Sequence, residues 1–358
     1  MKRHEIPTPA LIVDIAAMER NIERMAEFFA DGPCKLRPHF KAHKTPAIAK
    51  RQLAAGSCTG LTCATVSEAE VIVQERLTDD ILIANEVVGP GKAARLAKLA
   101  AQADVKAGID SVAGLDELAA AAREAGATIG VLVEVDIGFR CGVAPGEAAV
   151  ELARRANQTD GVALRGLMGS EGHTVALEDR SERETRAGQA LERLLSSVAA
   201  VREAGLPCDI VSAGGTGTYD ITGRTEGVTE IQAGSYVLMD SDYAKLDLPF
   251  EQALSVIGTV LSRPKPDRLN ADCGHKSCTM DHGLPPVKGI EGASVVVLGD
   301  EHATVTVPPE SAIAVGDRIE LWPSHIDPTI NLHEMLYALD GDEVVEVWPV
   351  AARGYGRP

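Results

Sequence analysis

The chain has 358 residues, of which 45% are hydrophobic, and a formal net charge of −17 at pH 7. This length predicts one large or two moderate domains, and the hydrophobic content is sufficient for a packed core. The negative charge argues against a general role in binding nucleic acid or anionic membranes, because phosphates repel such a surface. It leaves room for a local pocket that binds a small anion.

Seven cysteines are scattered along the chain without a CxxC pair. This usage predicts reduced thiols in a cytoplasmic protein and argues against a disulfide framework or a zinc ribbon. The N-terminal stretch MKRHEIPTPALIVD has no long apolar segment before a small-residue cleavage site, so we expect no signal peptide. No uninterrupted apolar run reaches about 18 residues, so we expect no membrane span.

The first elements are a strand over Ala10–Ile15 and a helix over Ala17–Phe29, where apolar residues recur at helical spacing. From Leu36 onward, short apolar segments alternate with alanine-rich helical segments. Eight strands are predicted: Leu36–Lys41, Gly60–Thr65, Ile81–Val87, Val105–Asp110, Ile129–Asp136, Leu164–Ser170, Ile210–Gly214 and Glu230–Ala233. The helices predicted between them are Thr45–Ala55, Val66–Glu75, Gly91–Ala101, Val112–Ala125, Ala144–Arg155, Arg180–Ala204 and Tyr219–Thr225.

This alternation is typical of the α/β class and predicts a (β/α)8 TIM-type barrel of about 250 residues. A doubly wound open sheet is the alternative, although no GxGxxG follows an early strand, which weakens its dinucleotide-binding version. Beyond residue 248 the pattern becomes β-rich and predicts a smaller all-β domain. Its expected strands are Ala253–Ser262, Ser294–Leu298, Ala303–Val307, Arg318–Trp322 and Val344–Val350. We therefore expect a barrel over residues 8–248 and a β domain over residues 249–358 that also includes residues 1–7.

Lys41 is the first candidate functional residue, in the stretch LRPHFKAHKTP. It ends a predicted strand between His39 and His43, and a partly desolvated lysine amine can attack carbonyl groups. The alternative is an ordinary basic turn, formed by Lys41 with Lys44.

A second candidate is the small-residue segment SAGGTGTYD, which begins at Ser212. Backbone N–H groups near Gly214 and Gly215 and the hydroxyl of Thr216 can converge on a phosphate. A tight turn without a ligand is the alternative.

Two further strand ends carry charged or ionisable side chains, Arg140 and His173. Arg140 lies in a glycine-punctuated turn that is typical of a pocket edge, or else forms part of a salt-bridged loop. His173 is a candidate general base or, equally, a hydrogen-bonded structural histidine.

His325 and Asp327 are candidate metal ligands in the β domain. On an extended segment, residues i and i+2 point to the same side, about 6–7 Å apart at Cα. An imidazole and a carboxylate suit Mg²⁺, Mn²⁺ or Zn²⁺, but two ligands are half a site, and a surface pair is the alternative. A zinc cluster built from Cys273, His275, Cys278 and His282 is a minority interpretation because its spacing is irregular.

Across nearly its whole length the chain resembles the D-threonine aldolase and D-serine dehydratase family, whose barrel is shared with alanine racemases. The resemblance implies that Lys41 carries pyridoxal phosphate (PLP) covalently. Gly215 and Thr216 match the family's phosphate loop, and Ser235 with Tyr236 matches its second phosphate contact. Arg140 corresponds to an arginine near the cofactor ring oxygen, although the turn before it is one residue shorter than in the family.

The resemblance also implies that Gln232 stands where alanine racemases have an arginine facing the pyridine nitrogen. A neutral partner leaves the ring a weaker electron sink, which suits chemistry in which a metal shares the charge. The family carries a His-x-Asp or His-x-Cys pair followed by Pro-Thr, as at His325. Asp327 is a hard ligand that favours Mg²⁺ or Mn²⁺ over Zn²⁺ and favours an aldolase over a dehydratase.

We therefore predict PLP- and metal-dependent cleavage of D-β-hydroxy-α-amino acids to glycine and an aldehyde. The alternative with the same parts is a D-serine or D-3-hydroxyaspartate type dehydratase. A racemase is weakened because no tyrosine motif for the second base can be placed, and a non-enzymatic PLP carrier usually lacks the β domain. The resemblance further implies a homodimer.

Overall fold

The computed structural model describes residues 1–354, which form two compact units. One unit contains Met1–Arg24, Ala42–Ile48 and the segment that starts at Ser235. The other contains Met25–Lys41 and Ala49–Gly234 and holds all the strands predicted for the barrel. The boundary that the sequence places near residue 248 stays a prediction.

The unit built from Met25–Lys41 and Ala49–Gly234 is a parallel eight-stranded sheet in the order β2-β9-β8-β7-β6-β5-β4-β3. Parallel bridges Leu36↔Cys58 and His39↔Thr62 join its two ends and close the barrel. The predicted (β/α)8 class is confirmed. The strands are β2 (Lys35–Leu36), β3 (Leu61–Cys63), β4 (Asp80–Glu86), β5 (Asp104–Ile109), β6 (Ile129–Glu134), β7 (Val162–Met168), β8 (Ile210–Ala213) and β9 (Glu230–Ile231).

The barrel strands are short apolar runs because both of their faces are covered. Every residue of β6 (IGVLVE) is buried, including its terminal glutamate. The first strand is shorter than the predicted Leu36–Lys41, since regular pairing ends at Leu36. Beyond it, single hydrogen bonds from Arg37 N–H to Ile231 (2.8 Å) and from His39 N–H to Ala233 (3.0 Å) continue the contact with β9.

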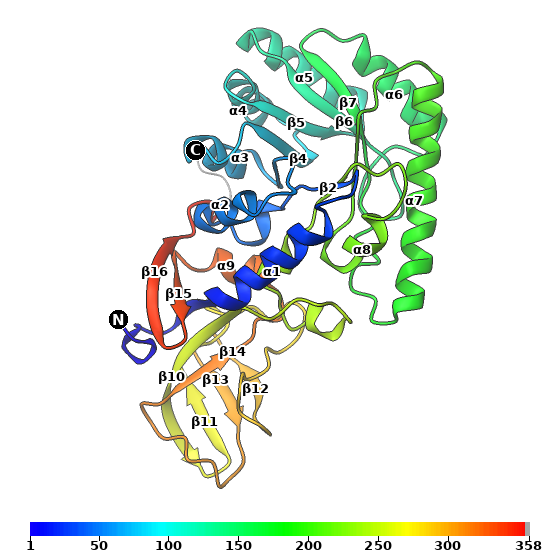
Figure 1. Cartoon of the computed structure of the whole chain (residues 1–358). Helices are drawn as coiled ribbons and strands as arrows, with labels where there is room; N and C mark the ends of the chain where they lie inside the picture. The colour runs from blue at the N-terminus through cyan, green and yellow to red at the C-terminus, as the bar shows by residue number, and fades with distance from the viewer. Residues whose placement is uncertain (355–358) are drawn as a thin grey trace. The chain divides into compact units, whose positions relative to one another are not determined.

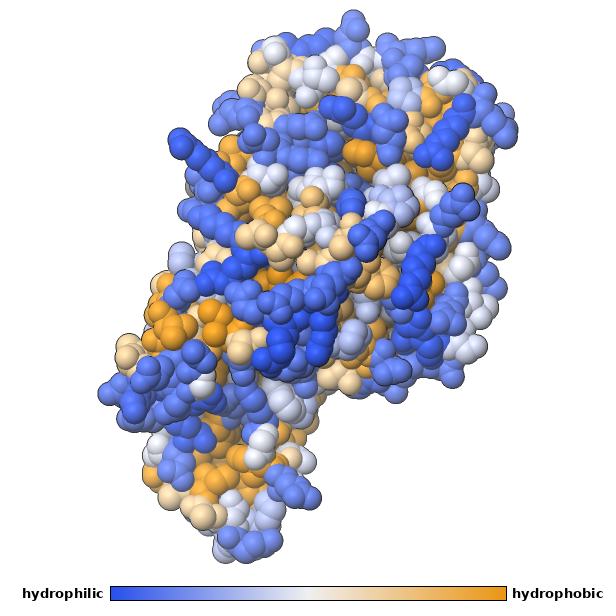
Figure 2. Space-filling model, in the orientation of Figure 1, coloured by the Kyte–Doolittle hydropathy of each residue, from blue (hydrophilic) through white to orange (hydrophobic). Residues whose placement is uncertain are grey.

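Helices cover the outside of the barrel, as Figure 1 shows for α3 to α6 around β4 to β7. Hydrophilic residues predominate on the helical surface visible in Figure 2, as expected for helices that bury one face. Local capping defines their ends: Ser111 Oγ accepts from Gly114 N–H at the start of α5, and Gly126 ends that helix with φ 62°. The helices are α2 (Pro46–Ala54), α3 (Val66–Gln74), α4 (Pro90–Ala100), α5 (Val112–Ala125), α6 (Glu147–Asn157), α7 (Arg180–Glu203) and α8 (Tyr219–Thr222).

The sheet of the other unit has the order β12-β13-β11-β10-β1-β15-β16, with β14 also paired to β10. β1 pairs antiparallel with β10 and parallel with β15, although the predicted barrel range of 8–248 includes it. β11 and β15 lie where no strand was predicted. The strands are β1 (Ala10–Asp14), β10 (Leu254–Lys265), β11 (Arg268–Ala271), β12 (Ser294–Leu298), β13 (Ala303–Thr306), β14 (Arg318–Leu321), β15 (Met335–Asp340) and β16 (Glu343–Pro349).

The remaining helices are α1 (Ile15–Phe28), which follows β1, and the short α9 (Ile326–Asn331). Both occur at segments rich in apolar residues that alternate with polar ones. Among residues 1–354, no helix is long and apolar enough to cross a membrane.

A partly buried ion network joins four barrel strands, β2, β4, β5 and β9. The Arg37 guanidinium is 2.7 Å from Asp80 and 2.9 Å from Glu230, and only 1% of its side chain is exposed. Lys106 is 2.7 Å from the same Asp80 carboxylate and 2.8 Å from Asp104. Each charge therefore has an oppositely charged partner, which is the condition for keeping charges in a protein interior.

We expect Arg37→Met to lower the free energy of unfolding by about 3–5 kcal/mol, because the Glu230 carboxylate would stay buried without its cation. Chemical denaturation monitored by circular dichroism measures this change. The matched control is Arg155→Met, since Arg155 forms an exposed pair with Asp116 and should contribute less than about 1 kcal/mol. Equal losses in the two variants would contradict the role of the network.

Candidate active site in the barrel and candidate metal site

Lys41 lies directly after the first barrel strand, in the short 3-10 turn η2 (Phe40–Ala42). It is half-buried, and its neighbours Phe40 and His43 are fully buried. Lys44, the partner in the alternative of a solvated basic turn, is only 4% exposed. A lysine at the carboxyl ends of parallel strands occupies the place where barrel enzymes bind their ligands.

The small-residue segment forms a compact loop after β8. Gly214 has φ 80°, a left-handed conformation that glycine adopts without strain. The 3-10 turn η3 (Thr216–Thr218) follows, and a Cβ on Gly217 would lie 1.9 Å from the carbonyl oxygen of Val175. Gly214 is thus required for its backbone conformation, and Gly217 is required for the close approach of Val175.

The buried Glu171 carboxylate holds this loop. It accepts hydrogen bonds from Gly214 N–H (3.0 Å), from Thr218 Oγ1 (3.0 Å) and from Thr222 Oγ1 (2.6 Å). Glu171 is 1% exposed, so these bonds are shielded from water. One side chain therefore fixes both the glycine turn and the following helix α8.

The residues of the loop suit a phosphate group. A Cβ added to Gly215 would meet only Val175 Cγ1 at 3.4 Å, so there is space over this glycine. The charge of Glu171 is already compensated by its three donors. The Gly214 and Gly215 N–H groups donate to Glu171 and to Thr218 Oγ1, so binding of a phosphate by this loop stays a prediction. Donors of this kind bind phosphate without a cationic side chain.

Gln232 and Ser212 lie side by side at the ends of β9 and β8. The Gln232 Nε2 donates to Ser212 Oγ at 2.9 Å, and Ser212 is fully buried. Ser235 and Tyr236 lie in the 3-10 turn η4 (Ser235–Val237) of the other unit and are both buried. Their predicted contact with a phosphate stays a prediction.

Arg140 is exposed, and its guanidinium contacts two barrel strands, β4 and β6, near their carboxyl ends. It donates to the Ala84 carbonyl (2.9 Å) in β4 and lies 3.6 Å from Glu134 at the end of β6. Its backbone has φ 49°, which is uncommon for a residue with a side chain. Arg140 thus has an unusual backbone conformation, and its guanidinium reaches β4 and β6.

His173 is exposed and lies over the glycine turn before Arg140. Its ring stacks on Phe139 at 6.5 Å between centroids, and a Cβ on Gly138 would approach its Cε1 to 3.0 Å. It lines a cavity of about 280 Å³ together with Arg186 and Arg193 of α7. This position gives His173 access to solvent, but its role as a base stays a prediction.

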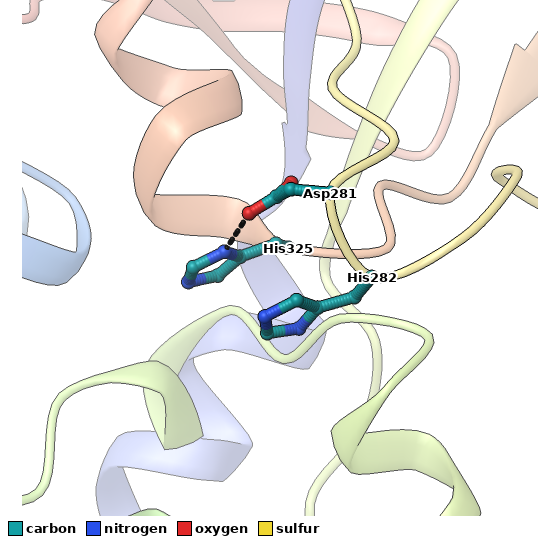
Figure 3. A group of neighbouring side chains, drawn as sticks. All are labelled: Asp281, His282 and His325. Atoms are coloured by element: carbon teal, nitrogen blue, oxygen red, sulfur yellow. Dashed lines mark hydrogen bonds and ion pairs between the residues drawn. The ribbon is translucent and has the colours of Figure 1, made fainter.

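A candidate metal site lies in the other unit, where Asp281, His282 and His325 come together (Figure 3). One possible ligand atom of each residue lies within 4.8 Å of the others. His325 Nδ1 is 2.6 Å from Asp281 Oδ2, and the rings of His282 and His325 stack at 4.2 Å. A carboxylate that binds Nδ1 leaves Nε2 of the same imidazole available to a metal ion. Imidazole and carboxylate groups suit Mn²⁺, Mg²⁺ or Zn²⁺.

The expectation that His325 and Asp327 share an extended segment is wrong. His325 is extended, but it is the N-cap of α9, and Asp327 lies in the first helical turn. An aspartate is favourable at a helix N-terminus, and proline is tolerated there, so Asp327-Pro328 signals a helix start.

The buried Asp240 accepts from Ile326 N–H (3.3 Å), and burial raises the pKa of Asp240 to about 6.

The minority interpretation of a zinc cluster finds no support among residues 1–354. Neither group of potential ligands there includes Cys273, His275 or Cys278. Burial raises the pKa of Cys273 to about 12, so its thiol stays protonated.

Comparisons with known proteins agree with this architecture. The model described as "Alanine racemase, N-terminal domain" matches residues 13–242, and the one described as "Putative serine dehydratase domain" matches residues 253–339. These matches define a PLP enzyme with an alanine racemase-like barrel and a second domain.

Individual relatives narrow the class. A D-threonine aldolase from Arthrobacter sp is 40% identical, over 98% of this chain and 94% of that protein. A 3-hydroxy-D-aspartate aldolase from Paracoccus denitrificans (strain Pd 1222) is 35% identical, over 99% of this chain and 94% of that protein. The crystal structure of D-threonine aldolase from Filomicrobium marinum superposes with a TM-score of 0.95 at 41% identity, covering 98% of this chain and 96% of that one.

The chain belongs to the D-threonine aldolase and D-serine dehydratase family of fold-type III PLP enzymes. The predictions of the family, of the fold and of a PLP-dependent lyase are thereby confirmed.

Glu171 and Asp281 were not predicted as site residues from the sequence, and His282 was predicted only as part of the zinc cluster. Glu171 stands two residues before His173, but only His173 was predicted as a site residue. Asp281 and His282 are far from His325 in the chain, so no local spacing connects them. For Glu171, the available signal was a carboxylate between two glycines at the end of an apolar strand.

We expect Glu171→Ala to weaken binding of PLP by about tenfold or more, because a lost charged hydrogen bond corresponds to about 1.5–3 kcal/mol. Fluorescence titration of the cofactor-free protein measures the Kd. Glu178→Ala, at an exposed position of the same loop, is the control and should leave the Kd unchanged. An unaltered Kd in the Glu171 variant would refute its role in shaping the loop.

We expect His325→Ala to weaken binding of Mn²⁺ by at least about tenfold, since second-shell changes alone typically cost that much. Calorimetric titration of the chelator-treated protein measures the affinity. His302→Ala, at an exposed position, should bind Mn²⁺ like the unchanged protein. Equal affinities in all three proteins would show that the metal binds elsewhere.

Proposed function

We propose that this protein cleaves D-β-hydroxy-α-amino acids of the D-threonine type to glycine and an aldehyde. The observation that carries the proposal is the presence, in one barrel, of the half-buried Lys41 and a Glu171-held glycine loop suited to an anion. The similarity to two aldolases over almost the whole chain favours this reaction within the family. PLP supplies an electron-accepting ring joined to the amino group of the substrate.

The barrel residues bind and orient the cofactor in this proposal. Lys41 provides the amine that carries it, and the loop from Ser212 through Gly214, Gly215 and Thr216 holds its phosphate, with Ser235 and Tyr236 as second contacts. Arg140 would contact the ring oxygen. Gln232, whose amide is fixed by Ser212, faces the ring nitrogen with a neutral group. A fixed ring selects the substrate bond that breaks, because that bond must overlap the ring's π system.

The metal-binding residues in this proposal are His325 and Asp327, together with Asp281 and His282. A divalent ion there lowers the pKa of a coordinated hydroxyl, as metals do for bound water. The carboxylates favour Mg²⁺ or Mn²⁺, with Zn²⁺ as the alternative. His173 is the proposed acceptor of the hydroxyl proton. We further propose that the protein is a homodimer, as the family resemblance implies. Its free cysteines support a cytoplasmic location.

The products distinguish the proposed reaction from the dehydratase alternative. Protein supplied with PLP and Mn²⁺ is incubated with D-threonine or D-serine, with and without EDTA. We expect glycine and acetaldehyde from D-threonine and loss of this activity in EDTA. A keto acid with ammonia would establish the dehydratase instead, and full activity after EDTA treatment would remove the metal from the proposal.

We expect Lys41→Ala to abolish covalent retention of PLP, because no amine would remain to carry it. Absorbance after gel filtration and after borohydride reduction measures retention. Lys50→Ala, at an exposed position on α2, should retain the cofactor as the unchanged protein does. A chromophore that survives borohydride treatment in the Lys41 variant would assign the cofactor to another lysine.

A further inference from the structure

Two glutamates that the proposed reaction does not use meet at the carboxyl ends of the barrel strands. Glu86 is the last residue of β4, and Glu134 is the last residue of β6, with β5 between them. Glu134 is only 1% exposed and Glu86 is half-buried. An oxygen of each carboxylate and the Cys141 sulfur all lie within 4.8 Å of one another.

Two carboxylate oxygens of this group lack a hydrogen-bond donor among the residues that the structure describes. Cys141 Sγ–H donates to Glu86 Oε2 (3.4 Å) and Glu134 Oε1 (3.3 Å), and Arg140 lies 3.6 Å from Glu134 Oε1. Within residues 1–354, no donor reaches the buried atoms Glu86 Oε1 and Glu134 Oε2. A buried carboxylate oxygen without a donor is costly. One proton shared between the two carboxylates would remove one of the two negative charges that otherwise lie close together.

A proton suits the group better than a metal ion. The charge of Arg140 already faces Glu134, and it would repel a divalent cation. Burial and then the two glutamate charges raise the pKa of Cys141 to about 12, so its sulfur donates a hydrogen bond and does not act as a thiolate ligand. Two carboxylates with one proton carry a single negative charge, which matches the single positive charge of Arg140.

The electrostatics of the surrounding elements favour retention of that proton near neutral pH. Burial, and next the charge of Glu86, raise the pKa of Glu134 to about 7, while Arg140 acts in the opposite direction. Asp110, after β5, lines a small cavity with Glu86 and adds negative charge on that side. The neighbours from β5 and β7 are Gly108 and Met168, which carry no charge.

We propose that the Glu86 and Glu134 carboxylates share one proton and that this pair positions the Arg140 guanidinium. When the proton leaves to solvent, the pair gains a second negative charge and draws Arg140 more strongly toward it. The consequence for the cofactor rests on the proposed function, since Arg140 is assigned there to the PLP ring oxygen. The shared proton itself does not depend on PLP.

The first test uses the cofactor-free protein. Infrared difference spectra recorded between about pH 6.5 and about pH 8.5 detect a protonated carboxyl group, because few carboxyls titrate in this range. We expect one such band, lost with a midpoint near 7 and absent from both Glu86→Gln and Glu134→Gln, whose amides supply the missing donor. Asp116→Asn, at an exposed carboxylate on α5, should keep the band. Its absence from the unchanged protein, or its persistence in both glutamine variants, would overturn the proposal.

The second test uses the protein loaded with PLP. We expect the absorption maximum of the bound cofactor to shift with the same midpoint, and this shift to move by more than about one pH unit in Glu86→Gln. A pH-independent spectrum in a protein that shows the infrared band would overturn the positioning of Arg140 and keep the shared proton. Failure to bind PLP with the band present would refute the proposed function. Mn²⁺ that stays bound in His325→Ala but not in Glu134→Gln would make the pair a metal site and overturn the proposal.

Discussion

The first barrel strand is held by the ion pairs of Arg37, and the placement of Lys41 depends on this strand. β2 has only two residues in regular pairing, and single hydrogen bonds connect its continuation with β9. Arg37 adds two buried ion pairs, to the first residues of β4 and β9. Lys41 follows four residues later and is half-buried, after the buried His39 and Phe40. A short strand can therefore present the Lys41 amine at a defined position because the ion pairs of Arg37 hold the chain directly after the strand.

Most of the fold could be predicted from local pattern. Segments such as IGVLVE are apolar because both faces of a parallel strand are covered, and the helices between them have clear caps at Ser111 and Gly126. The pattern was less informative for β1, whose apolar run does not reveal which sheet it joins. β11 and β15 were overlooked because short strands with mixed burial resemble turns.

In the candidate sites, too, some residues could be predicted from local sequence, whereas others come together only in the folded chain. The glycine loop and Lys41 were visible because glycine spacing and strand position are local properties. Asp281 was not, and His282 was assigned only to a zinc cluster, since a metal site assembled from separate loops leaves no fixed spacing with His325. The geometry expected for Asp327 was wrong because the helix-starting tendency of Asp-Pro outweighs the extended conformation assumed for His-x-Asp. Glu86 and Glu134 are ordinary strand-terminal residues in the sequence, and only the folded barrel reveals their contact.

The close approach of Gly217 to the Val175 carbonyl connects the glycine loop after β8 with the turn after β7. Glu171 bonds to the glycine loop, and Val175 packs against it four residues further on, so the turn that carries His173 is attached to the loop on both sides. Binding of an anion in the loop would consequently restrict the motion of His173 without direct contact between the two. Binding at the glycine loop would in this way order the turn that carries His173 through two short backbone segments.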